Sequence, residues 1–130
     1  MRGGEPDEIG RRFALRFALR AQRDVDSAHA YLMEQAGEEV ADEWKAGLFE
    51  AVSLLSTLPR RFAVVPEQAH FSHAVRQIIY RRRSGSVAYR VLYTIREEPE
   101  EAPTVFIMHV RHASAHPITL AEAHALDSDT

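Results

Sequence analysis

The chain has 130 residues, of which 45% are hydrophobic, and its formal net charge at pH 7 is −3. This length suits one domain with a modest core and argues against a second domain. The sequence contains no cysteine, which excludes disulfides and thiolate metal sites, and no stretch approaches the roughly 18 apolar residues of a membrane span, so we expect a cytoplasmic protein with no membrane partner.

The first predicted element is a strand that follows a polar leader. Residues 1–10 contain three glycines and one proline and show no periodicity, so we expect them to be disordered and residues 11–130 to form a single domain. Residues 13–18 alternate partly between apolar and polar side chains, which predicts a short strand.

Two helices are predicted next. From Leu19 to Ala36 apolar residues recur at spacings of three and four, and Gly37 follows where a helix would end. Acidic residues then open a second apolar pattern that contains Trp44 and continues to Pro59. The pair predicts an antiparallel helical hairpin whose apolar stripes, including Trp44, pack on a sheet.

Three further strands are predicted after a connecting loop over residues 59–72. They cover residues 74–82, 86–96 and 104–112, and they are rich in Val, Ile, Tyr and Phe. Turn-forming residues separate them, which indicates a three-stranded antiparallel meander.

The middle strand has two distinct faces. Val87, Tyr89, Val91, Tyr93 and Ile95 share the face that we expect to meet the helices. A short helix over residues 120–126 is predicted in the C-terminal tail. The fold class is therefore α+β, with the order β-α-α-β-β-β and a short tail.

The hairpin formed by the first two of these strands is basic. No acidic residue occurs between Gln68 and Glu97, whereas six arginines do: Arg76, Arg81, Arg82, Arg83, Arg90 and Arg96. We call these six residues the hairpin arginines. They predict a binding groove for a polyanion or an acidic peptide.

A simpler interpretation exists for part of this set. Arg81, Arg82 and Arg83 lie beside a tight turn, where positive charge also prevents sheet edges from aggregating. Arg90 lies in the middle of a strand among hydrophobic residues, so its charge needs either a partner or a cleft.

Three of the seven histidines have spacings sometimes seen in metal sites, namely His109, His112 and His116. Residues three apart on a regular strand point to opposite faces, so His109 and His112 cannot both ligate one ion without a bulge. We therefore expect neither a metal nor another cofactor. His112 is either a general acid or base or an ordinary surface histidine.

Several short motifs occur in an order that resembles the ParE/RelE toxin superfamily. They are Ala21-x-x-Asp24-Val25, Tyr31-Leu32, the stretch from Leu55 to Pro59, Val75-Arg76-Gln77, Tyr89-Arg90-Val91-Leu92-Tyr93 and Val110-Arg111-His112. The likeness covers about residues 13–114. It implies a toxin of a type II toxin-antitoxin module, often called a plasmid stabilisation protein, which a cognate antitoxin neutralises. The assembly that it implies is a homodimer or a hetero-oligomer with this antitoxin.

The resemblance leaves three functions open. A ParE-like toxin would bind DNA gyrase without a catalytic set, and here Arg76, Arg90, Arg111 and His112 would lie on an exposed groove. A RelE-like toxin would cut messenger RNA on the ribosome, with Arg90 and Arg111 stabilising the transition state and His112 or Tyr93 moving protons.

The third function is that of a non-toxic or decayed binding module. Ala113 and Ser114 stand where many relatives have a glycine and an arginine, which motivates this alternative. The two long helices, and the lack of a tyrosine after Tyr93, favour the ParE-like function over the enzyme.

Overall fold

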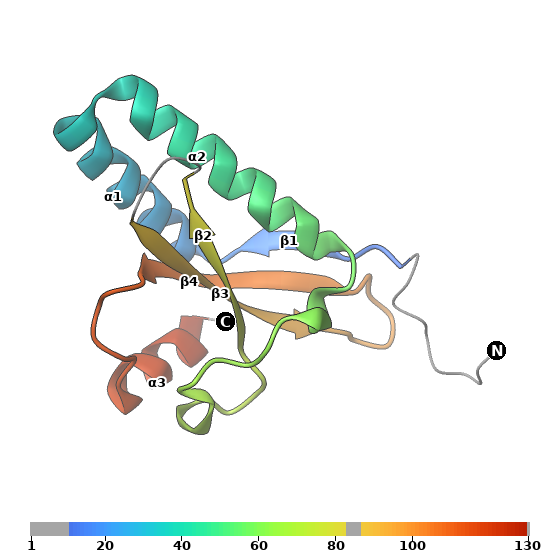
Figure 1. Cartoon of the computed structure of the whole chain (residues 1–130). Coiled ribbons are helices and arrows are strands. Elements are labelled where there is room, and N and C mark those ends of the chain that lie inside the picture. The colour runs from blue at the N-terminus through green and yellow to red at the C-terminus, as the bar shows by residue number, and fades with distance from the viewer. Residues whose placement is uncertain (1–10, 83–86, 130) are drawn as a thin grey trace.

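A computed structural model describes residues 11–82 and 87–129. The expected leader over residues 1–10, and Arg83 among the hairpin arginines, lie outside the described residues. The helices and strands follow the order β1-α1-α2-β2-β3-β4-α3, so the predicted order is confirmed up to the last strand (Figure 1).

The helical hairpin consists of α1 (Leu19–Ala36) and α2 (Glu38–Ser53). Gly37 joins them at φ 97°, a conformation that favours glycine, and its N–H donates to the Met33 carbonyl to close α1. The prediction that the second helix continues to Pro59 is wrong. The helix is followed by a 3-10 turn over Leu54–Ser56, and the chain leaves the right-handed helical region at Leu58, at φ 49°, because that region is disfavoured for the residue before a proline.

The sheet contains β1 (Ala14–Phe17), β2 (Arg76–Arg81), β3 (Ala88–Arg96) and β4 (Thr104–His112). The last three strands form the predicted antiparallel meander. The strand order is β1-β4-β3-β2, with β1 parallel to β4, so the sheet is mixed. This parallel pairing follows from the helical hairpin, which carries the chain from β1 over one face of the sheet.

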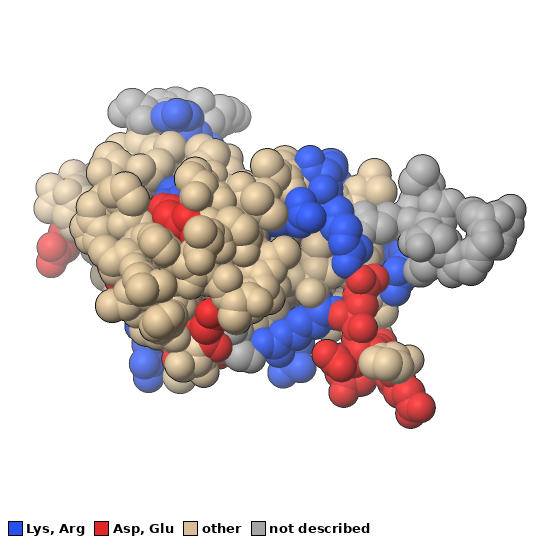
Figure 2. Space-filling view, turned by 90° about the horizontal axis from the view of Figure 1, so that it is seen from below, with Lys and Arg blue, Asp and Glu red and all other residues tan. Residues whose placement is uncertain are grey.

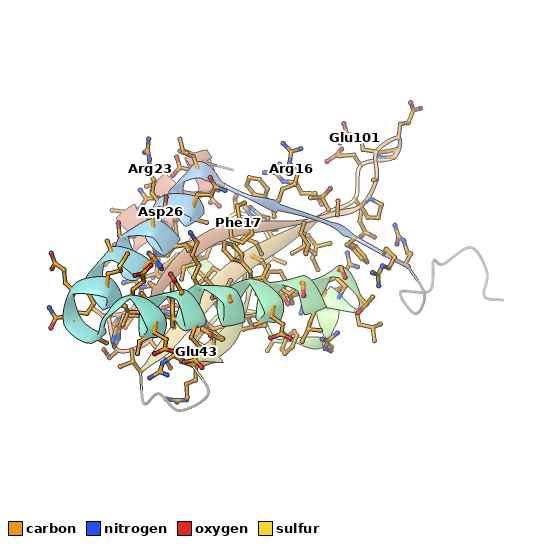
Figure 3. The ribbon with its side chains drawn as sticks, turned by 90° about the horizontal axis from the view of Figure 1, so that it is seen from above. Arg16, Phe17, Arg23, Asp26, Glu43 and Glu101 are labelled. Atoms are coloured by element: carbon orange, nitrogen blue, oxygen red, sulfur yellow. The ribbon has the colours of Figure 1, made fainter. Side chains whose placement is uncertain are left out.

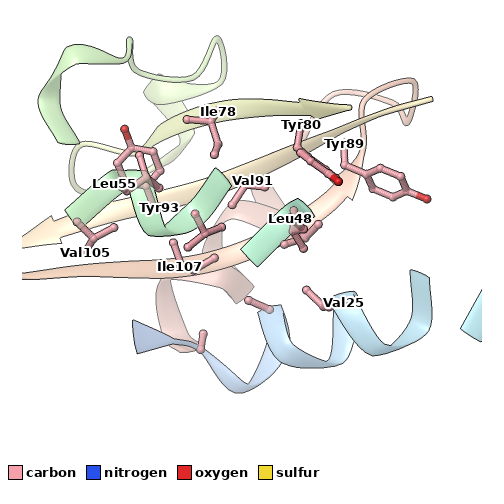
Figure 4. Close-up of a cluster of buried hydrophobic side chains, with 14 of the residues drawn as sticks. Val25, Leu48, Leu55, Ile78, Tyr80, Tyr89, Val91, Tyr93, Val105 and Ile107 are labelled. Atoms are coloured by element: carbon pink, nitrogen blue, oxygen red, sulfur yellow. The ribbon is translucent and has the colours of Figure 1, made fainter. Parts of the chain in front are cut away.

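The larger core lies between this sheet and the two helices (Figure 4). Tyr89, Val91 and Tyr93 of β3 point into it, as predicted, and Trp44 of α2 is 2% exposed there. Trp44 also packs edge-on against Tyr89, with ring centroids 5.0 Å apart. The helices therefore cover the face of the meander that the alternation indicates.

A second core covers the opposite face of the sheet. The sequence analysis predicted no element that packs on this face. Its residues come from the segment before β2, from the sheet and from the C-terminal part of the chain: Val65, Phe71, Val75, Leu92, Met108, Ile118, Ala123 and Leu126. The helix α3 (Leu120–Asp129) is longer than predicted. It begins with a capping box, in which Thr119 Oγ1 accepts from Glu122 N–H and Glu122 Oε1 accepts from Thr119 N–H.

Candidate functional site

The hairpin arginines do not share one surface. Arg76 is paired with Tyr93 in the register and lies on the helix side of the sheet, where it donates to the Phe62 and Arg60 carbonyls. Arg96 stacks on the Phe106 ring, with its guanidinium carbon 4.5 Å from the ring centroid. Seen from the α3 side, the blue side chains form separate patches (Figure 2). The prediction of one basic groove is therefore wrong in its geometry.

Arg90 is the most enclosed of these arginines. Its residue is 8% exposed, so its expected place on an exposed groove is also wrong. It has instead the partner that its position requires: Nη1 and Nη2 donate to the two Glu67 oxygens at 3.0 and 2.7 Å, and Nε donates to Gln77 at 2.7 Å. The acid comes from the connecting loop, outside the acid-free hairpin.

The Arg90 ion pair controls the ionisation of Glu67. Burial by itself would raise the pKa of this carboxyl group, but hydrogen bonds from Arg90 and from the Ile118 N–H outweigh it and lower the pKa to about 2. Glu67 therefore stays ionised at neutral pH. It joins the connecting loop, the sheet and the start of the C-terminal tail.

The outer end of the hairpin holds the remaining described arginines. Arg82 donates to Glu43 of α2 at 2.8 Å, and Figure 3 shows Glu43 at that end of the helices. Arg81 is exposed on β2 on the same face as Ile79, which is 52% exposed, and Val87, which comes just before β3, is 44% exposed. This end combines positive charge with apolar surface on an edge strand.

Tyr93 and His112, the two residues that the RelE-like alternative needs for proton transfer, differ in their exposure to solvent. Tyr93 is fully buried, and its hydroxyl donates to the Pro59 carbonyl at 2.6 Å. His112 is exposed and packs on Tyr89, with ring centroids 5.4 Å apart, while its Nδ1 lies 2.6 Å from the Ser114 hydroxyl. Only His112 of these two is open to a substrate in this conformation.

A β-bulge creates a different site on β4. Tyr93 pairs with Ile107 and Leu92 with His109, so Met108 is the extra residue. The neighbouring strand β1 ends opposite Ile107, and the Val110 N–H therefore has no strand partner there.

Asp24 of α1 takes the place of that missing strand. Its Oδ2 accepts from Val110 N–H at 3.0 Å and lies 2.6 Å from His109 Nδ1. Because a carboxylate only accepts, the His109 proton is assigned to Nδ1. His109 is paired with Leu92, which lies in the second core, and His112 is paired with Tyr89, which lies in the larger core. The two histidines therefore lie on opposite faces of the sheet, as predicted.

Next to this pair, a hollow of about 360 Å³ opens between α1, β4 and α3. Its lining residues are Arg20, Asp24, His109, Val110, Arg111, Ala115, Glu122, Ala125 and Leu126. We call this space the Arg111 hollow. The Arg111 side chain is 10% exposed, and its Nη2 donates to the His116 carbonyl at 2.8 Å.

Sequence reasoning identified Arg111 but missed the hollow around it. The sequence analysis named Asp24 only as part of a family motif and His109 only as a candidate metal ligand. It did not name Arg20 or Glu122. The Thr119-x-x-Glu122 capping box was a usable signal for the start of α3. Within residues 11–82 and 87–129, no group of three or more His, Asp or Glu side chains is arranged to hold a metal ion.

The helices of the described chain are also too short or too polar to cross a membrane. The described chain has a helical hairpin on one face of a mixed four-stranded sheet, with the first strand parallel to the last. A solved structure titled "Chromosomal ParDE TA system from P. aeruginosa" has this fold: its TM-score is 0.55 at 15% identity, over 77% of this chain and 95% of that chain.

The family model described as "ParE toxin of type II toxin-antitoxin system, parDE" matches residues 15–117. The chain belongs to this ParE toxin family. A search of curated protein sequences gave no match.

Proposed function

We propose that this chain is the toxin of a type II toxin-antitoxin module, that a cognate antitoxin neutralises it, and that it acts by binding DNA gyrase. Its membership of the ParE toxin family carries the proposal. The state of two candidate catalytic residues supports binding over catalysis, because Arg90 is engaged by Glu67 and the Tyr93 hydroxyl by Pro59.

The outer end of the hairpin is the surface that we assign to the antitoxin. It lies on the edge strand β2, which presents Arg81 and the exposed Ile79, and it includes the exposed Val87 just before β3. An extended segment with acidic and apolar side chains would complement this edge, by adding backbone hydrogen bonds and placing alternate side chains on the sheet.

Expression of the chain alone tests the toxin activity. We expect growth arrest with induction of the DNA-damage response, and trapped gyrase-DNA cleavage complexes when the purified protein is added to gyrase. Co-expression of the short reading frame next to the gene should restore growth. A culture that grows normally with abundant soluble protein would instead support the non-toxic binding module.

A charge reversal tests the antitoxin surface. Arg81→Glu should weaken antitoxin binding by about 10-fold, because a repulsive charge then faces the acidic segment. Arg16→Glu is the matched control, since Arg16 is exposed on β1 at the opposite edge of the sheet. Equal losses in both variants would mean that only net charge matters and that β2 is not the surface.

One observation favours the RelE-like alternative. Arg111 and the exposed His112 are neighbours at the end of β4, so a cation and a titratable group lie together. Codon-positioned cuts in translated messenger RNA, without trapped gyrase complexes, would select this enzyme activity. Intact messenger RNA in arrested cells would leave gyrase as the target.

A further inference from the structure

The Arg111 side chain is as buried as that of Arg90 in its ion pair, yet among the described residues it has no carboxylate at hydrogen-bond distance. Its one short hydrogen bond goes to the His116 carbonyl, at 2.8 Å. The His109 Nε2 atom lies 3.5 Å from Nη1, the Glu122 carboxylate lies 3.9 Å away, and Nε has no partner among the described residues. A guanidinium that is 10% exposed normally has an anionic partner.

Both carboxylates that line the hollow are engaged elsewhere. Asp24 accepts from His109 and from the Val110 N–H left open by the bulge. Glu122 accepts from the Thr119 N–H at 2.9 Å as part of the capping box, which fixes its position at the start of α3. In this arrangement each carboxylate holds a backbone N–H, and the Glu122 carboxylate stays 3.9 Å from Arg111, so the guanidinium keeps donor capacity for an external anion.

The charges of the hollow indicate what kind of anion it accepts. Arg20 and Arg111 are offset by Asp24 and Glu122, and Arg20 also donates to Asp129 at 3.1 Å, so the hollow as a whole is not positive. The two carboxylates would repel a dianionic phosphate more strongly than a singly charged carboxylate, which can still accept hydrogen bonds from the Arg111 guanidinium. A hollow of about 360 Å³ has room for such a group.

We propose that the Arg111 hollow is a binding site for one carboxylate group, with the Arg111 guanidinium as its main partner. The site depends on α3, which supplies Glu122, Ala125 and Leu126 to the wall and begins after the residues that match the family. It is therefore a feature of this chain's C-terminal part. It does not depend on the proposed gyrase or antitoxin binding.

The carboxylate can come from a small molecule or from an acidic side chain of a protein segment, and the two sources differ in one contact. Leu19, which is 63% exposed, lies at the adjoining hollow that shares Arg20 and Asp24 with this one. An apolar neighbour in a peptide could pack on Leu19, whereas acetate could not. A peptide with a leucine beside a glutamate should thus bind more tightly than acetate if the source is a protein.

NMR titration of the full chain at neutral pH tests the site. Sodium acetate and the dipeptide N-acetyl-Leu-Glu-amide should each shift the Arg111 Nε–H and His109 resonances saturably, whereas sodium chloride at equal ionic strength should not. Arg111→Gln should weaken both by about 10-fold or more, as expected for a lost charged hydrogen bond. Arg16→Gln, which removes an exposed charge on β1, should leave both unchanged.

A second variant keeps the result independent of any effect of Arg111 on folding. Ala125→Leu on the wall should also weaken acetate by about 10-fold, because it fills the hollow while Arg111 stays in place. If the dipeptide binds more tightly than acetate, the site is assigned to a protein segment. If the two bind equally, it is assigned to a small carboxylate. Shifts that chloride reproduces, or equal weakening by Arg16→Gln, would overturn the proposal.

Discussion

Arg90 and Arg111 face each other directly across β3 and β4, and their side chains are equally exposed, at 10% each. Within the part of the chain that the structure describes, Arg90 has three short hydrogen bonds to side chains, two of them to one carboxylate, whereas Arg111 has a single short bond to a carbonyl. Residue type, burial and sheet face are the same in both. The two arginines differ only in their hydrogen-bond partners. Arg90 holds the fold together, and Arg111 is available to a ligand.

The difference arises from where each neighbouring acid is anchored. Glu67 lies in the connecting loop and can turn both oxygens toward Arg90, while one of them also accepts from the Ile118 N–H. Glu122 is anchored by the helix that it caps, and a gap of 3.9 Å to Arg111 remains. The fold thus satisfies one cation of the pair and leaves the other incompletely satisfied.

The largest effect is expected from breaking the satisfied pair. Glu67→Ala leaves the Arg90 guanidinium buried without its anion, which should lower the free energy of unfolding by about 3–5 kcal/mol. It also removes the acceptor of the Ile118 N–H, so α3 should become more susceptible to proteolysis. Urea unfolding measures the first effect, and a loss below about 1 kcal/mol would show that Arg90 is hydrated instead.

Acid should reproduce part of this effect. The pKa of Glu67 is about 2 in the folded chain against 4.5 ordinarily, so its contribution is fully present above pH 4.5 and is lost as the pH falls through 2. The shift corresponds to about 3 kcal/mol. Between pH 5 and pH 2 the wild type should therefore lose about 3 kcal/mol more than Glu67→Gln does.

Measuring urea unfolding of the wild type and of Glu67→Gln at each pH provides an internal control. Arg60 and Arg11 lower the pKa of Glu97 against the effect of burial, and the wild type and the Glu67→Gln variant share this carboxyl group. Its contribution cancels in the difference between them. Parallel pH profiles for the two proteins would contradict the assignment of the low pKa to Glu67.

The sequence predicts the strands, the start of each helix and the face of β3 that meets the helices, because all of these follow from local periodicity. It also predicts that Arg90 needs either a partner or a cleft. It does not predict that Glu67 is that partner, because the pairing joins residues 23 positions apart through a loop without periodicity.

The second core and the Arg111 hollow could not be predicted from the sequence for a similar reason. The bulge at Met108 and the end of β1 opposite Ile107 are properties of strand pairing, and only together do they bring Asp24 to Val110. Gly47 is another such case: a Cβ there would lie 2.1 Å from the Tyr80 hydroxyl, which donates to the Trp44 carbonyl. Nothing in the local sequence of α2 signals that approach.

A moderate effect is expected at the start of α3. Thr119→Ala removes the hydroxyl that accepts from the Glu122 N–H and should cost about 1 kcal/mol in the free energy of unfolding. Urea unfolding measures this loss. A loss near zero would show that this capping hydrogen bond does not stabilise the start of α3.

The smallest effect on stability is expected from Arg111→Gln, although Arg111 lies opposite Arg90 and is equally buried. Removing a charge with a single short hydrogen bond relieves part of its desolvation, so the free energy of unfolding should change by less than about 1 kcal/mol in either direction. Arg90→Gln, measured beside it, should cost about 3 kcal/mol or more because it strands Glu67. Equal losses in the two variants would show that Arg111 is also a structural arginine, and the hollow beside it would then have no unmet charge to offer a ligand.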